Sequence, residues 1–184
     1  RQRQMCIRDR SYNAHASDAK HDHILDMLKE GKDIALVSDA GTPTISDPGV
    51  KIVSQIKELF DVEFEIIPIP GASAVITALS ASGLPSSEFV FLGFLPHKKG
   101  RETLFNEIAE SKRTICFYES PHRIMKALES LENVLDETRE VVVAREITKI
   151  HEQFLRGSAS EIKAYFAAHP DKIKGEFVVI VAGK

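Results

Sequence analysis

The stretch that decides the fold is IALVSDAGTP, residues 34–43, in which a short apolar run ends in a polar loop. Ile34 to Ser38 predicts a buried β-strand, because aliphatic residues follow one another there without a charge. The loop that follows offers a carboxylate at Asp39, and Gly41 lets the backbone approach a ligand. Ligands of open α/β sheets bind beyond the carboxyl ends of strands. The stretch therefore predicts an α/β protein with a binding loop directly after a strand.

Helices are expected on both sides of this stretch. Helical spacing of apolar residues predicts one helix over Asp18–Glu30, which Gly31 ends. A second helix is predicted to reach Phe60, with Asp47 as its N-cap and Pro48 as its first residue. Val62–Ile69 is the next expected strand. Ala72–Ser82 is expected to form a helix buried on several sides, because it is apolar almost all round.

After Pro85 the composition shifts to longer charged helices, and a domain boundary is predicted there. Strands and helices alternate again in the second half, which favours a sheet covered by helices in each domain. The expected strands are 89–94, 114–118, 140–144, 153–156 and 176–181, and the expected helices are 101–109, 121–131 and 160–167, with Ser120 as N-cap of the middle one.

The first ten residues, RQRQMCIRDR, differ in character from everything after them, since they hold four Arg and show no periodicity. We expect residues 1–10 to be a non-native segment, with a basic disordered tail as the alternative. The predicted domains are then 11–85, a partial N-terminal α/β domain, and 86–184. Removing the four Arg and one Asp leaves 20 basic and 26 acidic residues, a net charge of −6 in place of −3.

Composition limits the kind of protein. Of the 184 residues 43% are hydrophobic and 28% charged, which is typical of an ordinary globular chain. A net acidic protein is a poor bulk binder of nucleic acid, so any phosphate-binding surface must be local. Cys6 and Cys116 form no CxxC motif, which favours the reducing cytoplasm. The uncharged stretch 66–87 is interrupted by Pro and Gly, so no membrane span is expected.

Two loops are candidates for ligand binding, because both follow predicted strands. They are Ser38–Pro43 and Pro70–Ser73, and well-made turns are the alternative explanation for both. The sequence holds no GxGxxG, P-loop or nucleophile elbow, so nucleotide hydrolysis and serine acyl transfer lack support. No metal site is expected. His21 and His23, for example, would point to different faces of a helix.

The second half also carries basic residues near predicted strand ends. They would form a local basic cleft if they converge, and a scattered solvated set if they do not. The residues in question are Lys98, Lys99, Arg101, Arg113, Arg123, Arg145, Lys149 and Lys174.

Several separated blocks share one resemblance. Residues 34–43 and the Ser46-Asp47-Pro48-Gly49 block resemble the signature loop of the ribosomal RNA small-subunit methyltransferase I family, part of the tetrapyrrole-methylase-like group. Further blocks follow in the order of that family: Pro70-Gly71, 77–85 (TALSASGLP), 93–96 (GFLP), 117–123 (FYESPHR), 144–149 (AREITK) and 174–176 (KGE).

The resemblance implies a two-domain fold with a cofactor cleft between the domains. It implies a homodimer that transfers a methyl group from S-adenosylmethionine to a cytidine 2′-hydroxyl in the decoding region of 16S rRNA. The residues that this implies at the cofactor are Ser38, Asp39, Ala40, Gly41, Thr42, Pro43, Pro70, Gly71, Ser73, Ala74, Tyr118, Ala144 and Gly175.

Catalytic and RNA-binding residues are expected among the charged side chains of the chain. Glu119, Glu146 or Asp39 is expected to accept the hydroxyl proton, with Lys149 beside the reacting ribose. The residues expected at RNA are Arg123, Arg145, Lys98, Lys99 and Arg101.

The family pattern begins earlier than this chain does. Before the stretch that starts here with Ser11-Tyr12, relatives carry a first strand, a Pro-Ile-Gly-Asn loop and a Glu-Asp-Thr-Arg motif. Two alternatives therefore stay open beside the rRNA methyltransferase. One is a small-molecule methylase of the same fold acting on a corrin-type tetrapyrrole, and the other is a catalytically silent chain that only dimerises or binds RNA.

Overall fold

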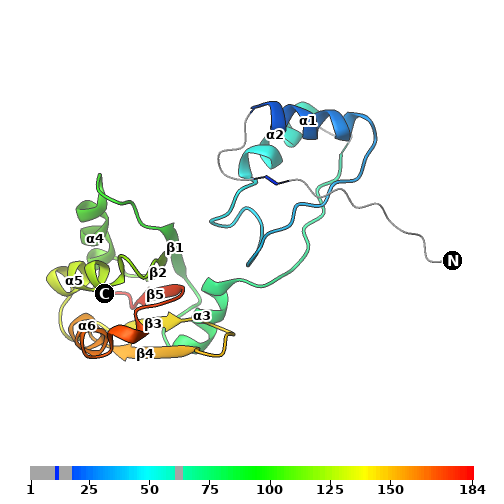
Figure 1. Ribbon diagram of the computed structural model, residues 1–184. Coiled ribbons are helices and arrows are strands. Elements are labelled where there is room, and N and C mark those ends of the chain that lie inside the picture. Colours follow the sequence, from blue (N-terminus) through cyan, green and yellow to red (C-terminus); the bar gives the residue numbers. More distant parts are fainter. Residues whose placement is uncertain (1–10, 13–17, 61–63) are drawn as a thin grey trace. The chain divides into compact units, whose positions relative to one another are not determined.

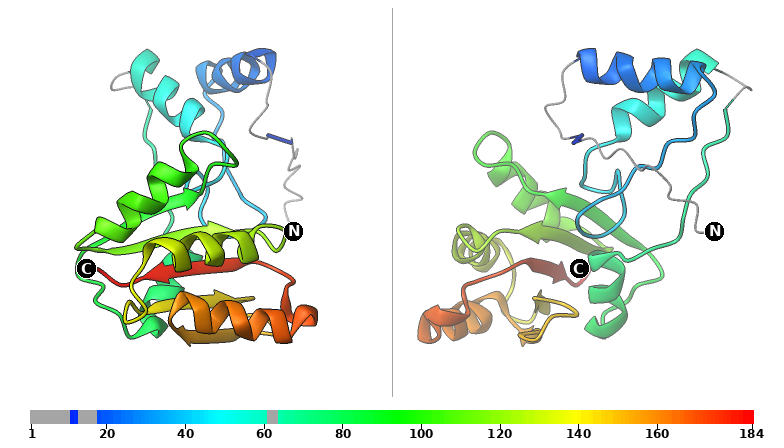
Figure 2. Two further views of the ribbon diagram at one scale, coloured as in Figure 1. Left: turned by 90° about the vertical axis from the view of Figure 1, so that its left-hand side faces the viewer. Right: turned by 45° about the vertical axis from the view of Figure 1, so that its right-hand side comes forward.

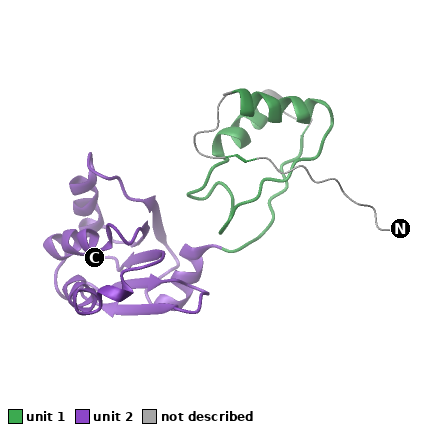
Figure 3. Cartoon of the chain, in the orientation of Figure 1, with its two compact units in different colours: residues 1–72 green, residues 73–184 purple. Residues whose placement is uncertain are grey.

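The structure is a computed structural model that describes residues 11–12, 18–60 and 64–184. It divides into two compact units, Arg1–Ala72 and Ser73–Lys184 (Figure 3). The ten residues expected to be non-native lie outside the described part, and so do residues 61–63 at the start of the expected second strand.

The described part of unit 1 contains two helices, α1 (Asp18–Lys29) and α2 (Val50–Phe60), joined by irregular segments (Figure 1). Both helices were predicted. The start of α2 differs from the prediction. Its first hydrogen bond runs from the Val53 N–H to the Gly49 carbonyl, at 3.0 Å. Gly49 therefore takes the N-cap position predicted for Asp47. Its φ of 129° suits glycine, and a Cβ there would lie 2.6 Å from the Leu36 side chain.

The two strands expected in unit 1 do not form in the described residues. Residues 34–38 and 64–69 have no regular strand structure. A strand exists only where a neighbour pairs with its backbone, and the described part of unit 1 supplies none. Their apolar side chains accordingly remain in solvent, with Val37 82% and Ile69 77% exposed. The described part of unit 1 therefore lacks the two strands that were predicted for it.

Unit 2 follows the predicted alternation closely. Its elements are α3 (Ala74–Ser82), β1 (Phe89–Phe94), α4 (Arg101–Glu110), β2 (Thr114–Glu119), α5 (Ile124–Val134), β3 (Val141–Arg145), β4 (Gln153–Gly157), α6 (Ala159–Ala168), the 3-10 turn Pro170–Lys172 and β5 (Phe177–Val181). Helix α5 begins later than predicted, because the N–H groups of Arg123 and Ile124 first close a turn on the Ser120 carbonyl. Arg123, and not Ser120, is its N-cap.

The five strands form one mixed sheet in the order β1-β2-β5-β3-β4. Strands β1 and β2 are parallel, and β5 is antiparallel to both of its neighbours, β2 and β3. Strand β4 is antiparallel to β3. Strands β1, β2 and β3 therefore run in one direction, and their carboxyl ends share an edge of the sheet with the amino ends of β4 and β5. We call this edge the polar edge.

The sheet is packed on both faces (Figure 2). Alternate residues such as Phe117, Val143 and Val179 face α4, α5 and α6, and form the larger core. The intervening residues, among them Cys116 and Val142, face α3 in a second core. Burial raises the pKa of the Cys116 thiol to about 12, so the thiol stays protonated in this core.

The boundary between the units lies before α3, and not after Pro85 as predicted. The reason is that Val75, Ala78 and Leu79 of α3 are buried against the sheet of unit 2. No helix in the described ranges is long and apolar enough to cross a membrane.

Candidate active site

The polar edge gathers the candidate residues of the second half. Glu119, the last residue of β2, pairs with Phe177 of β5, which pairs with Arg145 of β3, which pairs in turn with Gln153 of β4. Neighbouring strands lie about 4.8 Å apart, so the backbones of Glu119 and Arg145 are separated by roughly 10 Å. Residues far apart in the sequence thus meet along one edge because β5 lies between β2 and β3.

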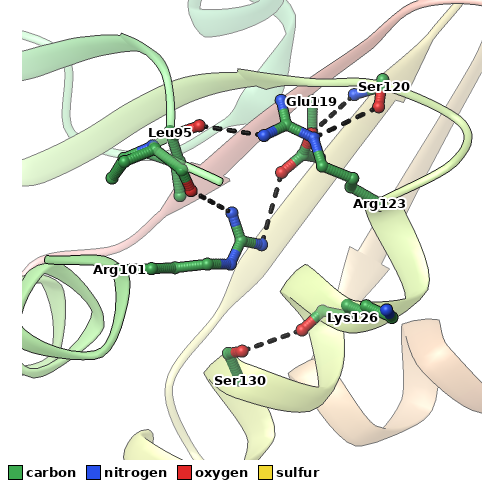
Figure 4. Close-up of polar contacts among 8 residues, drawn as sticks. Leu95, Arg101, Glu119, Ser120, Arg123, Lys126 and Ser130 are labelled. Carbon is green, nitrogen blue, oxygen red and sulfur yellow. Dashed lines mark hydrogen bonds and ion pairs between the residues drawn. The ribbon is translucent and has the colours of Figure 1, made fainter. Parts of the chain in front are cut away.

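Glu119 is at the centre of a buried ion cluster (Figure 4). Its side chain is fully buried, and its carboxylate contacts the Arg123 Nε at 2.9 Å and the Arg101 Nη2 at 3.4 Å. The Ser120 N–H also donates to it, at 2.8 Å. A buried carboxylate needs such partners, since an unpaired charge away from water is costly.

The same two arginines hold the loop that follows β1. Arg123 Nη1 donates to the Leu95 carbonyl at 3.0 Å, and Arg101 Nη1 donates to the Pro96 carbonyl at 3.1 Å (Figure 4). We call Arg101, Glu119 and Arg123 the arginine clamp. Its arginine side chains are only 15% and 17% exposed, and the RNA contacts expected of them stay predictions. Lys98 and Lys99, on the clamped loop, are exposed.

A second charged group lies on the loop after β3. Glu146 Oε1 accepts hydrogen bonds from Lys149 Nζ at 2.9 Å and from the Glu176 N–H at 3.0 Å. Lys149 Nζ also contacts Glu176 Oε2 at 2.9 Å. The bond from Lys149 is the main cause that lowers the pKa of Glu146, and the bonds to Glu176 and Glu146 raise the pKa of Lys149. Glu146 is therefore held as an anion and Lys149 as a cation.

Gly175 makes room for this group. Its φ is 85°, and a Cβ in its place would overlap the Glu146 carboxyl group. Only glycine therefore suits both the backbone conformation and the close approach. Glu146 itself has a positive φ of 51°, which shows how tightly its loop is folded.

The Arg145 side chain is buried, although a direct contact with RNA was expected of it. It is 6% exposed, and its guanidinium donates to the carbonyls of Lys174 at 3.0 Å and His151 at 3.3 Å, and to the Gln153 side chain at 3.4 Å. Lys174 and His151 lie on loops that flank the polar edge, and Gln153 is the first residue of β4. Protein acceptors therefore surround the Arg145 guanidinium, and its expected contact with RNA stays a prediction.

The residues expected at the cofactor in unit 2 differ in accessibility. The Tyr118 hydroxyl accepts from the Val75 N–H at 3.3 Å, which places the ring beside Ser73 and Ala74 at the start of α3. Burial raises the pKa of Tyr118, so it stays a neutral phenol. Ala144 is fully buried in the core beneath α3 and offers no side-chain surface.

In unit 1 the two predicted binding loops touch each other. Thr42 Oγ1 donates to the Ala72 carbonyl at 2.9 Å, which joins the Ser38–Pro43 loop to the end of Pro70–Ala72. Ser38 Oγ donates to the Ala40 carbonyl at 2.8 Å, and Gly41 has a φ of 74°. Asp39 is exposed at the tip. The arrangement presents a carboxylate and backbone groups next to glycines.

Two residues at the polar edge were not predicted as site residues. Glu176 completes the Lys149 contacts, and its place in the Lys174-Gly175-Glu176 block was a usable signal. Phe94 lies at the end of β1 and is 57% exposed, and no local pattern distinguishes it from the buried aromatic residues of the sheet.

Comparisons with known proteins agree with this architecture. The sequence profile of the Tetrapyrrole (Corrin/Porphyrin) Methylases matches residues 2–163. A solved cobalt precorrin-4 methyltransferase of cobalamin biosynthesis superposes with a TM-score of 0.64 at 19% identity, covering 92% of this chain and 72% of that one. The uroporphyrin-III C-methyltransferase of Thermus thermophilus, complexed with S-adenosylhomocysteine, gives 0.57 at 14% identity, covering 90% and 72%. The chain belongs to the tetrapyrrole methylase family.

Within that family its relatives are more specific. Ribosomal RNA small subunit methyltransferase I of Synechocystis sp. is 46% identical over 94% of this chain and 61% of its own length. The protein of the same name from Thermotoga maritima is 41% identical over 95% of this chain and 76% of its own length. The chain therefore belongs to the ribosomal RNA small subunit methyltransferase I group. It spans about three fifths of the length of the first relatives that it matches.

The arginine clamp predicts a large loss of stability when its carboxylate is removed. In Glu119→Ala two mostly buried guanidinium groups lose their counter-charge, and the free energy of unfolding should fall by roughly 3 kcal/mol. Urea denaturation followed by circular dichroism measures this. The control Glu107→Ala removes an exposed carboxylate from α4 and should change stability by less than about 0.5 kcal/mol. Equal losses in both variants would contradict the clamp.

The close approach at Gly175 predicts a difference between two glycine substitutions. Gly83 has nearly the same φ, 82°, but no atom lies within 4 Å of the point that a Cβ would occupy, so Gly83→Ala should lose only the ~1–2 kcal/mol of backbone strain. Gly175→Ala carries the same strain and also displaces the Glu146 carboxylate. Its melting temperature should therefore fall further than that of Gly83→Ala. Indistinguishable melting temperatures would mean that Glu146 moves aside freely.

The lowered pKa of Glu146 predicts a pH dependence of stability. The ordinary pKa is 4.5, and the folded value is lower, so the stabilisation is present above pH 4.5 and disappears as the pH falls through the folded pKa. Wild type should thus be more stable than Glu146→Gln at neutral pH, and the difference should shrink on acidification below 4.5. Urea titrations across this range measure it, and a constant difference would contradict the assignment.

Proposed function

We propose that the chain carries the methyl-transfer function of an S-adenosylmethionine-dependent rRNA methyltransferase, acting on a cytidine 2′-hydroxyl in the decoding region of 16S rRNA. The observation that supports this most is the polar edge, where β1, β2, β3 and β5 bring together the Phe117–Arg123, Ala144–Lys149 and Lys174–Glu176 blocks. The relatives at 41–48% identity are named for rRNA methylation. The corrin and porphyrin methylases share the fold at 14–22% identity.

The loops of unit 1 fit the proposed cofactor. Gly41 and Gly71 leave their backbones open, and the Thr42–Ala72 hydrogen bond holds the two loops together. The exposed Asp39 carboxylate suits the ammonium group or the ribose hydroxyls of S-adenosylmethionine. When bound, that cofactor supplies a methyl group already activated on a sulfonium. Ser38, Ala40, Pro43 and Pro70 complete this proposed surface, and Ser73, Ala74, Tyr118 and Gly175 are proposed to contribute from unit 2.

The chain must then hold the ribose oxygen in line with the methyl group and manage the hydroxyl proton. Glu119 is fully buried between two arginines, and we propose that it holds the loop after β1 and is not the proton acceptor. Glu146 and the exposed Asp39 remain the proposed acceptors. The raised pKa of Lys149 keeps its ammonium charged, which suits a contact with RNA phosphate or with the developing alkoxide.

The proposal also includes the partner, the compartment and the oligomeric state. The partner is 16S rRNA in the small ribosomal subunit, in the cytoplasm, and the active form is a homodimer. Methyl transfer from a sulfonium needs no metal, and none is proposed.

Cofactor binding tests the loop assignment. Asp39→Ala should weaken S-adenosylmethionine binding by about ten-fold, because a charge-assisted hydrogen bond is lost. Asp47→Ala removes the same charge from the same loop region and should have a smaller effect. Isothermal titration calorimetry with the purified chain measures both, and equal affinities would contradict the role of Asp39.

Methyl transfer tests the reaction itself. The chain is incubated with radiolabelled S-adenosylmethionine and unmethylated small ribosomal subunits, and the modified nucleotide is mapped by ribose-methylation-sensitive sequencing. We expect label on a cytidine of the decoding region. Cofactor binding without labelled RNA would contradict the proposal, and label on a corrin-type tetrapyrrole would favour the small-molecule alternative.

A further inference from the structure

The connection between β1 and α4 combines an exposed aromatic ring with a short basic loop. Phe94 ends β1 and is 57% exposed, and the side chains of His97, Lys98 and Lys99 just after it are exposed as well. An extended chain spans at most about 3.6 Å per residue, so the Cα atoms of Phe94 and Lys98 lie within about 14 Å of each other. The ring and the positive charges therefore belong to one surface.

The arginine clamp gives this surface a fixed shape. Between the ring and the lysines, Leu95 is 2% exposed, and the carbonyls of Leu95 and Pro96 accept hydrogen bonds from Arg123 and Arg101. The Arg101 N–H closes a turn on the Lys98 carbonyl at 3.2 Å. The lysines are thus carried on an anchored turn, which lowers the entropy cost of binding a ligand.

The chemistry of the surface suits single-stranded RNA. The Phe94 ring meets the ring of Tyr118 edge-on, with centroids 5.4 Å apart, and more than half of its surface stays open. Proteins bind single strands by stacking bases on aromatic rings while cations hold the phosphates. The one carboxylate on the adjoining first turn of α4 is Glu102, so the loop keeps a net positive charge in an acidic chain.

We propose that Phe94 to Lys99, here called the stacking loop, docks a single-stranded segment of the RNA substrate. One nucleobase stacks on Phe94, and neighbouring phosphates contact Lys98 and Lys99. Arg101, Glu119 and Arg123 act as positioning residues that hold this loop. The inference rests on the proposed function, which it deepens by assigning the RNA contact to exposed residues in place of the buried arginines.

Two sets of variants test the stacking loop. Phe94→Leu keeps an apolar side chain but removes the aromatic face, whereas Phe94→Tyr keeps the aromatic face. The double variant Lys98→Ala/Lys99→Ala removes two charges from the loop. Its matched control, Lys112→Ala/Lys126→Ala, removes two exposed charges elsewhere in unit 2. The probes are a fluorescein-labelled oligocytidylate and an RNA duplex of the same length, with binding followed by fluorescence anisotropy from ~50 to ~200 mM salt.

The expected results differ for the Phe94 ring, the two lysines and Glu119. Phe94→Leu should weaken oligocytidylate binding by about ten-fold and leave duplex binding unchanged, and Phe94→Tyr should restore the affinity. The double loop variant should reduce the slope of log affinity against log salt by about 1.4, which the control should not do. Glu119→Gln should raise the KM for RNA with little change in kcat, because the loop is loosened and the reacting groups are not.

Calorimetry with S-adenosylmethionine distinguishes a failure of the stacking-loop proposal from a failure of the proposed methyltransferase function. Suppose that wild type binds both cofactor and oligocytidylate, and that Phe94→Leu or the double loop variant binds oligocytidylate as wild type does. The proposed role of the stacking loop is then wrong, and the proposed function stands. An equal change in the salt slope of the control Lys112→Ala/Lys126→Ala would also contradict the proposed role of the stacking loop. An unchanged KM in Glu119→Gln would contradict the positioning role. Failure of wild type to bind either ligand would overturn both proposals.

Discussion

The insertion of β5 between β2 and β3 is the constraint on which unit 2 depends. Phe177–Val181 comes from the end of the chain, pairs antiparallel on both sides and is buried on both faces. Without it, β1-β2 and β3-β4 would be two separate ribbons, and a two-stranded ribbon is at best marginally stable in water. The same insertion aligns the carboxyl ends of β1, β2 and β3 at the polar edge.

Charge at that edge is arranged in two ways. At Glu119 a buried carboxylate orders two arginines, which in turn fix backbone carbonyls of the loop after β1. At Glu146 the partners are a lysine and a backbone N–H nearer the surface. The buried group therefore determines loop shape, whereas the more accessible group keeps a cation where a substrate can meet it. Arg101, Arg123 and Arg145 thus act as donors to acceptor groups of the protein itself.

Much of unit 2 could be predicted from the sequence, because its signals are local. Apolar periodicity predicted α4, α6 and the strands within a few residues, and several of the motif blocks are segments that the sheet brings to the polar edge. Local signals do not show which charged residues are buried. Arg145 and Arg123 are charged residues near strand ends, and nothing local shows that carbonyls from distant segments surround them.

The sequence by itself determined the order of helices and strands, the family, and the residue types available for chemistry. These depend on periodicity, capping and motif order, which neighbouring residues encode. Only the tertiary structure decided that α3 belongs to unit 2 and that residues 34–38 stay unpaired in the described part of unit 1. It also decided that Lys98, Lys99 and Phe94 are exposed while Arg101, Arg123 and Arg145 turn inward. Strand pairing and burial are properties of contacts between distant segments, so no local pattern can specify them.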